Sequence, residues 1–167
     1  MSPRQFADSL APLFEGAPSF LARLAEARPF DGMRTLFRAA RRVAREMSRP
    51  DQVELLNAHP RIGADPTAVS PLSYREQGYD RAPNQADAAI ARRLHELNEA
   101  YEERFGFRFV VFVAGRPRGA IVSVIEDALI ADGDEELRRA LADVVSIAED
   151  RLRALRAGAG SRPTIRA

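Results

Sequence analysis

Hydrophobic residues recur every three or four positions along most of this chain, which is the spacing of helices that bury one face. The clearest stripe joins Ile90, Leu94, Leu97 and Tyr101, which lie on one side of a single helical segment. Prolines and glycines separate this segment from its neighbours. The pattern predicts about eight helices, near residues 3–14, 18–28, 33–47, 50–59, 73–78, 85–104, 120–131 and 134–156.

One segment breaks the helical pattern. Residues 107–114 read Phe-Arg-Phe-Val-Val-Phe-Val-Ala, a composition typical of a strand. Because no partner strand is recognisable elsewhere, we expect a buried extended connector between two helices. A chain of 167 residues suits one domain. We therefore expect a single compact all-α domain over 1–157, followed by a flexible C-terminal tail over 158–167.

Composition narrows the chemistry that such a domain could perform. All 25 basic residues are arginine, and the chain contains no cysteine and two histidines. Without lysine it cannot form a Schiff base, and without cysteine it has neither a thiolate nucleophile nor a sulfur ligand for a metal. An enzyme with this composition relies on histidine, carboxylates, arginine and backbone dipoles.

The charge pattern argues against polyanionic partners. The arginines alternate with 24 acidic residues, which leaves a net charge of +1. We therefore expect a solvated helical surface with local ion pairs rather than a nucleic-acid interface. The sequence has no apolar run long enough to span a membrane, and its first residues are too polar for a secretory signal. These features lead us to expect a cytoplasmic protein without membrane or nucleic-acid partners.

The two histidines differ in their surroundings. His59 precedes Pro60 at the end of a short apolar helix, and a residue before proline is pushed out of the helical conformation. Its imidazole titrates near neutral pH and would project from a rigid helix end. There it could act in proton transfer or simply bond a carbonyl as a structural side chain. His95 lies off the apolar stripe and is expected at the surface.

A second candidate site is the sequence Ser73-Tyr74-Arg75-Glu76-Gln77. Serine followed three residues later by glutamate is the pattern of a capping box, in which Ser73 and Glu76 satisfy backbone N–H groups at a helix start. The same helix start would offer N–H donors to an anionic or carbonyl-rich ligand, with Glu76 and Gln77 facing it. The residues alone leave both interpretations open.

Two further features also have a structural and a functional interpretation. The backbone of residues 107–114 cannot stay unpaired in a protein interior. It either meets other segments of the chain or presents a row of donors and acceptors to a flat heterocycle. Arg151 is one arginine among 25, and surface exposure is its ordinary assignment.

Four motifs occur in order between Phe14 and about Leu155. They read Leu55-Leu56-Asn57-Ala58-His59-Pro60-Arg61-Ile62-Gly63, Ser73-x-x-Glu76-Gln77, Leu97-Asn98-x-x-Tyr101-x-x-Arg104-Phe105-Gly106-Phe107-x-Phe109-Val110-Val111, and Ile147-x-x-x-Arg151-Leu152. In this order and spacing they resemble the OHCU decarboxylase family. Its enzymes act on 2-oxo-4-hydroxy-4-carboxy-5-ureidoimidazoline in urate breakdown.

The resemblance implies an all-α fold that needs no cofactor or metal, is commonly a homodimer, and yields (S)-allantoin and CO2. It implies catalytic roles for His59 and Glu76. It implies substrate-binding roles for Pro60, Ser73, Gln77, Phe109, Val110, Val111, Phe112, Val113 and Arg151. The chain departs from many relatives at Arg61, where an acidic residue is common, and in the short loop over 60–72, so both could alter the pocket rim.

The implied reaction needs no prosthetic group, because a ring C=N beside the carboxylate can accept the electrons left after CO2 departs. We expect His59 to contact the carboxylate and hydroxyl region and to help deliver a proton to one face of the product. We expect Glu76 to orient the hydroxyl and to destabilise the neighbouring carboxylate. The ureido group, the ring amides and one oxygen would be held by Gln77, Ser73, the backbone of 109–113 and Arg151.

Two alternatives compete with this interpretation. The same scaffold could act on a related ureido or imidazoline compound, since a few kcal/mol of pocket shape decides between similar substrates. The chain could instead be a non-catalytic, arginine-rich helical binding module, which predicts salt-sensitive binding of polyanions.

Overall fold

The computed structural model describes residues 1–81 and 87–160. Across these residues the chain forms α-helices and two short 3-10 helices, and no strand. This confirms the predicted all-α fold. The elements in chain order are α1 (Pro3–Leu10), η1 (Ala11–Phe14), α2 (Pro18–Glu26), α3 (Met33–Glu46), α4 (Arg49–Asn57), η2 (Pro66–Ala68), α5 (Pro71–Glu76), α6 (Asp87–Phe105), α7 (Arg118–Ala128) and α8 (Gly133–Gly160).

The predicted helix over 3–14 is divided in the structure. Ser2 caps its start, because the Ser2 Oγ accepts the N–H of Gln5 at 3.2 Å while the Gln5 side chain accepts the N–H of Ser2 at 2.9 Å. α1 then ends at Leu10, and the chain tightens into the 3-10 helix η1. Pro12 explains the change, since it has no N–H to continue an α-helical hydrogen-bond ladder.

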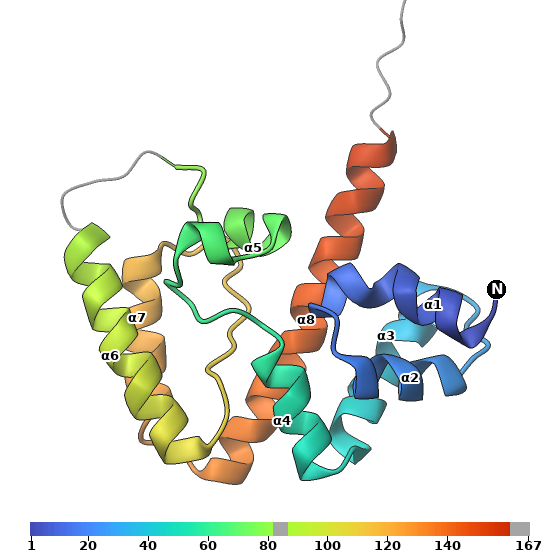
Figure 1. Cartoon of the computed structure of the whole chain (residues 1–167), viewed down its shortest axis with the longest axis horizontal. Coiled ribbons are helices and arrows are strands. Elements are labelled where there is room, and N and C mark those ends of the chain that lie inside the picture. The colour runs from blue at the N-terminus through green and yellow to red at the C-terminus, as the bar shows by residue number, and fades with distance from the viewer. Residues whose placement is uncertain (82–86, 161–167) are drawn as a thin grey trace, which may run out of the picture.

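Helix α8 runs between the two groups of helices that make up the domain (Figure 1). It contacts α3, α4 and η1, while α1 and α3 pack on α2, and α6 and α7 form a pair of their own. Figure 1 shows α1–α3 on one side of α8 and the α6–α7 pair on the other, with α5 between that pair and α8. The segment between α6 and α7 therefore returns through the interior of the molecule.

This returning segment is the extended connector expected from the sequence. Phe107 and Phe109 are each 1% exposed, and neither belongs to a sheet. The fully buried ring of Tyr101 lies against both, with centroid separations of 5.7 and 5.1 Å in edge-on geometry. Aromatic packing against α6 thus replaces the partner strand that the sequence lacks.

The end of the domain differs from the expectation. α8 continues through Gly160, so residues 158–160 are helical and do not begin a tail. Residues 161–167 of the predicted tail lie outside the described residues. None of the described helices combines the length and the apolarity needed to cross a lipid bilayer.

Candidate active site

A pocket of about 610 Å³ opens where the end of α4, helix α5, helix α8 and the extended connector meet. This volume lies within the range typical of small-molecule sites. The structure brings the sequence-predicted site residues together around it. They line the pocket with a few neighbours: His59, Pro60, Ile62, Ser73, Arg75, Glu76, Gln77, Arg81, Phe109, Val110, Val111, Phe112, Val113, Ala114, Gly115, Ile147, Asp150 and Arg151.

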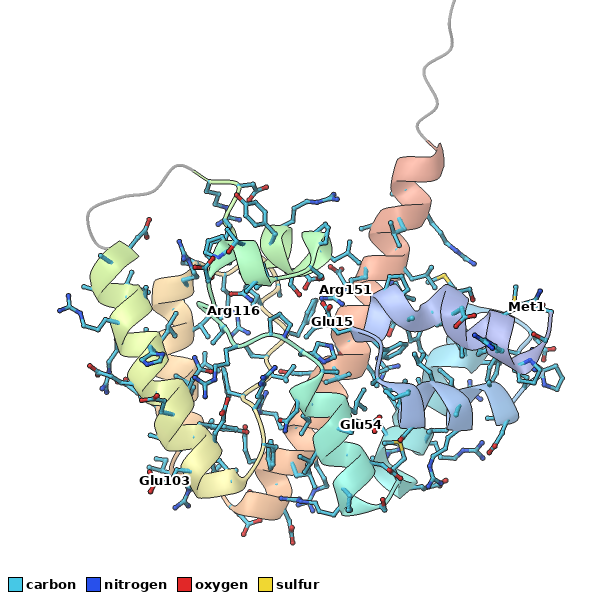
Figure 2. All side chains as sticks on the ribbon, viewed as in Figure 1. Met1, Glu15, Glu54, Glu103, Arg116 and Arg151 are labelled. Atoms are coloured by element: carbon cyan, nitrogen blue, oxygen red, sulfur yellow. The ribbon has the colours of Figure 1, made fainter. Side chains whose placement is uncertain are left out.

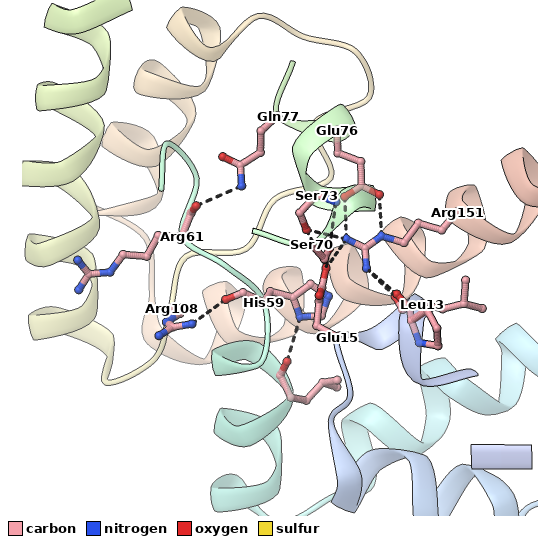
Figure 3. Close-up of polar contacts among 12 residues, drawn as sticks. Leu13, Glu15, His59, Arg61, Ser70, Ser73, Glu76, Gln77, Arg108 and Arg151 are labelled. Atoms are coloured by element: carbon pink, nitrogen blue, oxygen red, sulfur yellow. Dashed lines mark hydrogen bonds and ion pairs between the residues drawn. The ribbon is translucent and has the colours of Figure 1, made fainter. Parts of the chain in front are cut away.

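His59 occupies the floor of this pocket at the end of α4 and is 3% exposed. Its Nδ1 lies 3.1 Å from the carbonyl oxygen of Leu55, which can only accept a hydrogen bond, so Nδ1 carries the proton (Figure 3). Its Nε2 is buried and has no partner among the described residues. The structural interpretation of His59 therefore holds for Nδ1, while Nε2 is left without a protein partner among the described residues.

The environment keeps His59 neutral. Burial, and then the positive charge of Arg151, lower the pKa of His59 to about 4, although the bond to Leu55 and the charge of Glu15 act in the opposite direction. At neutral pH, Nε2 thus presents a lone pair. The backbone around the ring is fixed by Arg108, whose Nη1 donates to the carbonyl oxygens of Asn57 and His59 at 2.8 and 2.9 Å.

Helix α5 begins earlier than its sequence pattern suggested. Its N-cap is Ser70, whose Oγ accepts the N–H of Ser73 at 3.2 Å, and Pro71 occupies the first helical position. The proposed capping box of Ser73 and Glu76 is therefore wrong. Ser73 lies inside the helix, and Glu76 is directed toward α8 (Figure 3).

Arg151 is not a surface residue, because its side chain is only 2% exposed. Its Nε and Nη2 donate to the two oxygens of Glu76 at 2.6 and 2.8 Å, which is the bidentate geometry of a strong arginine–carboxylate pair. Its Nη1 donates to the carbonyl oxygens of Pro12 and Leu13 at 3.2 and 3.1 Å. Arg151 thereby joins α8 to α5 and to η1.

Glu15 completes this cluster and is not among the site residues predicted from the sequence. Its Oε1 accepts hydrogen bonds from Ser73 Oγ at 2.7 Å, Ser70 Oγ at 2.8 Å and Arg151 Nη2 at 2.8 Å. Ser73 Oγ also accepts from Arg151 Nη2 at 3.0 Å. Burial acts to raise the pKa of Glu15, but the serine bonds and the Arg151 charge outweigh it and hold that pKa below its ordinary value. No local motif marks Glu15, because all its partners are distant in sequence.

Gln77 ties α5 to the loop that follows Pro60. Its Oε1 accepts the N–H of Gly63 at 2.7 Å, and its Nε2 donates to the carbonyl oxygen of Arg61 at 3.2 Å. The Arg61 side chain turns away from the pocket and forms a two-point ion pair with Glu102 of α6, at 2.8 and 2.6 Å. The Arg61 side chain therefore braces the loop against α6 and does not line the pocket.

The backbone N–H and carbonyl groups of the extended connector point alternately toward α8 and away from it. Toward α8, the carbonyl of Val110 accepts from Arg139 Nη2 at 3.0 Å and the N–H of Phe112 donates to Asp143 at 3.0 Å. The backbone groups of Phe109 and Val111 then face the other way, since backbone polar groups alternate in an extended chain, whereas the carbonyl of Val113 accepts from the N–H and Nε of Arg116. Among the described residues, neither the N–H nor the carbonyl of Val111 has a protein partner. Val111 thus offers one donor and one acceptor to the pocket.

This site can accept one proton at His59 and fix a planar polar molecule against a backbone donor and acceptor. Glu76 adds a carboxylate whose orientation is set by Arg151. Pro60 lines the pocket beside the imidazole and gives it an apolar edge. Such an arrangement suits proton transfer on a small heterocycle.

Comparison with known proteins gives consistent matches along the chain. A model of the family described as OHCU decarboxylase matches residues 1–153. A 2-oxo-4-hydroxy-4-carboxy-5-ureidoimidazoline decarboxylase of Haloferax volcanii is 35% identical over 151 residues, which cover 88% of this chain and 86% of that protein. The uric acid degradation bifunctional protein PucL of Bacillus subtilis is 30% identical over 156 residues, covering 91% of this chain and 30% of that protein.

The fold also matches solved structures. A crystal structure of OHCU decarboxylase in the presence of (S)-allantoin aligns with a TM-score of 0.70 and 21% identity, covering 89% of this chain and 96% of the other. A crystal structure of (S)-allantoin synthase aligns with a TM-score of 0.64 and 21% identity, covering 92% of this chain and 50% of the other. At this identity the two alignments establish a shared fold.

Proposed function

This chain belongs to the OHCU decarboxylase family, and we propose that its pocket decarboxylates 2-oxo-4-hydroxy-4-carboxy-5-ureidoimidazoline to (S)-allantoin in urate breakdown. The resemblance drawn from four sequence motifs is thereby confirmed. One observation carries the proposal of mechanism. His59 is a buried neutral imidazole with Nδ1 bound to a carbonyl and Nε2 unpartnered.

The reaction breaks one C–C bond, shifts electron pairs toward the ring nitrogen and exchanges protons on neighbouring atoms. In this substrate C4 bears the hydroxyl and the carboxylate, and C5 bears the ureido group and a double bond to a ring nitrogen. When the bond from C4 to the carboxylate breaks, its electron pair forms a C4–C5 double bond and the C=N pair moves onto nitrogen. The nitrogen takes up a proton, the hydroxyl loses one as it becomes a carbonyl, and C5 gains one. One proton from water is consumed overall.

Nε2 of His59 suits both proton steps that involve carbon C4 and its neighbour. Because the imidazole is neutral, it first accepts the proton of the C4 hydroxyl. The resulting imidazolium then donates a proton to C5, the ring carbon bonded to C4, on the same face of the ring. The Leu55 carbonyl fixes the imidazole ring through Nδ1, so Nε2 delivers the proton to one face only, which accounts for a single enantiomer of the product.

The remaining groups position the substrate. Glu76, held at two points by Arg151, orients the hydroxyl and places negative charge near the departing carboxylate. The N–H and carbonyl of Val111, flanked by residues 109, 110, 112 and 113, read the ring amide. The ureido group faces the second Nε2–H of Gln77 and the surface of α5 that carries Ser73. Pro60 packs beside the substrate ring.

The test is circular dichroism of the allantoin formed when urate is oxidised by urate oxidase and hydrolysed by hydroxyisourate hydrolase. With this protein we expect rapid formation of one enantiomer, and with His59→Asn only the slow uncatalysed racemic product. His95→Asn is the matched control, because His95 is exposed on α6 and pairs there with Glu99 at 3.4 Å. A rate above about one tenth of wild type in His59→Asn would refute the role of His59. A racemic product with wild type would favour a related substrate.

We propose further that the protein is a homodimer, as the family resemblance implies, and that it acts in the cytoplasm without nucleic-acid or membrane partners, as its composition and charge pattern lead us to expect. Light scattering coupled to size-exclusion chromatography tests the dimer. A species with twice the mass of one chain is the expected result, and a single-chain mass at micromolar concentration would refute it.

A further inference from the structure

We propose that Glu15 is a positioning residue of this site, whose carboxylate holds Arg151 and Ser73 where they direct Glu76 into the pocket. The inference rests on the proposed function and adds a residue from the N-terminal helices to it. Glu15 itself does not line the pocket. It would therefore act through its neighbours rather than by touching the substrate.

The contacts of Glu15 join three segments that are far apart in the sequence (Figures 2 and 3). The residue follows η1, Ser73 lies in α5, and Arg151 lies in α8, and all three meet within hydrogen-bond distance. One carboxylate oxygen of Glu15 receives three bonds, with Ser70 as the third donor. Displacing this carboxylate would remove the bonds by which Glu15 fixes Ser73 and Arg151, while the Arg151–Glu76 pair would still join α8 to α5.

Charge balance makes the carboxylate necessary. The Arg151 guanidinium is almost fully buried and faces two carboxylates, Glu15 with a side chain 12% exposed and Glu76 with one 30% exposed. Since Nη2 is shared between them, Glu15 limits how far Arg151 is drawn toward Glu76. Without the charge of Glu15, Arg151 would be compensated by Glu76 alone, and Glu76 would be less able to act on the substrate.

The backbone around Glu15 is unusual in a way that fits this role. Glu15 has a φ of 52°, and the following Gly16 has a φ of 81°. A glutamate rarely adopts the left-handed conformation, and such residues persist where surrounding contacts hold them, often at functional sites. The turn aims the Glu15 side chain at α5 and α8 instead of along η1.

Glu15→Gln and Glu15→Asp test the inference, with Glu54→Gln as the matched control. Glu54 is also half-buried and also binds a serine, accepting from the N–H and the Oγ of Ser19 at 2.9 Å each, but it joins α4 to α2 away from the pocket. The coupled urate assay gives kcat and KM for each variant. Thermal melting establishes that each variant is folded.

We expect Glu15→Gln to lower kcat at least tenfold while KM changes less than threefold, because Glu15 does not touch the substrate. Glu15→Asp keeps the charge but is one carbon shorter, so it cannot keep all three bonds and should lower kcat at least threefold. Glu54→Gln should retain wild-type kcat. A kcat within twofold of wild type in either folded Glu15 variant would overturn the proposal, and Glu15→Asp decides if Glu15→Gln does not fold.

A second measurement separates this proposal from the proposed function. NMR detects the guanidinium protons of Arg151, assigned by their absence in Arg151→Lys. We expect slow exchange with water in wild type and in Glu54→Gln, and at least tenfold faster exchange in Glu15→Gln. If wild type forms no (S)-allantoin, the proposed function fails, while this exchange still tests the hold of Glu15 on Arg151. If the guanidinium protons of Arg151 exchange as slowly in Glu15→Gln as in wild type, the proposal that Glu15 holds Arg151 is refuted.

Discussion

The buried neutral state of His59 has a direct consequence for stability. The pKa of His59 in the folded protein is about 4, against an ordinary value of 6.5. As the pH falls below 6.5, the unfolded chain therefore binds a proton at this position before the folded chain does. The folded state loses stability between about pH 6.5 and pH 4, and keeps the full benefit of a neutral imidazole only above that window.

The size of this loss follows from the two pKa values. Each pKa unit corresponds to 1.36 kcal/mol, so full protonation in both states would cost the fold about 3 kcal/mol. By the same linkage, the part lost between pH 7 and pH 5 is about 2 kcal/mol. That is a large share of the stability of an ordinary domain, and it is measurable by denaturant unfolding.

The assay is urea unfolding followed by far-ultraviolet circular dichroism at pH 7 and pH 5. The free energy of unfolding of wild type should fall by about 2 kcal/mol more than that of His59→Asn over this interval. His95→Asn should fall as wild type does, because His95 is 63% exposed and lies away from the buried cluster. Equal pH dependence in wild type and His59→Asn would refute the reasoning, since it would mean that His59 gains its proton as readily in the folded state.

Three further predictions follow from the contacts of the site. Arg151→Met leaves Glu15 and Glu76 without their cation and should cost about 3 kcal/mol in urea unfolding at pH 7. A loss of unfolding free energy below about 1 kcal/mol would contradict the view that Arg151 compensates these two carboxylates. Gly63→Ala places a Cβ 3.2 Å from Leu94 Cδ1 at a φ of 77°, so it should cost about 1–2 kcal/mol. Wild-type stability there would contradict this backbone geometry. Arg139→Met frees the Val110 carbonyl and should raise KM severalfold with a smaller change in kcat, whereas an unchanged KM would contradict the proposed register.

Much of the fold could be predicted from local patterns. Apolar spacing located the helices, and the strand-like segment without a partner was correctly expected to be a buried connector. The start of α5 was misassigned although its signal was present, because Ser70 followed by Pro71 repeats the Ser2–Pro3 start of α1. The serine–glutamate spacing from Ser73 competed with that signal, and the proline at the first helical position decided the outcome.

The parts that could not be predicted are those that depend on distant contacts. Arg151 taken alone is expected at the surface, because nothing near it in sequence distinguishes it from 24 other arginines, and only the family resemblance predicts a place for it in the site. Its partners lie 75 and 136 positions away, at Glu76 and Glu15. A buried charge is tolerated only where the fold supplies its counterions, so the burial of Arg151 depends on tertiary structure that no local pattern records.

The hydrogen bonds of Arg151 show which groups of this site serve to hold the fold and which remain available to a ligand. An arginine has five N–H donors in a rigid fork, and here they reach two carboxylates, a serine and two backbone carbonyls. A lysine has three donors and could not serve them all. These donors are occupied by the protein, whereas Nε2 of His59 and the backbone of Val111 are among the pocket groups that have no partner in the described part of the chain. In the proposed mechanism, the proton transfers at His59 therefore use a nitrogen that the fold leaves unpaired, and the paired Arg151–Glu76 cluster sets the geometry around it.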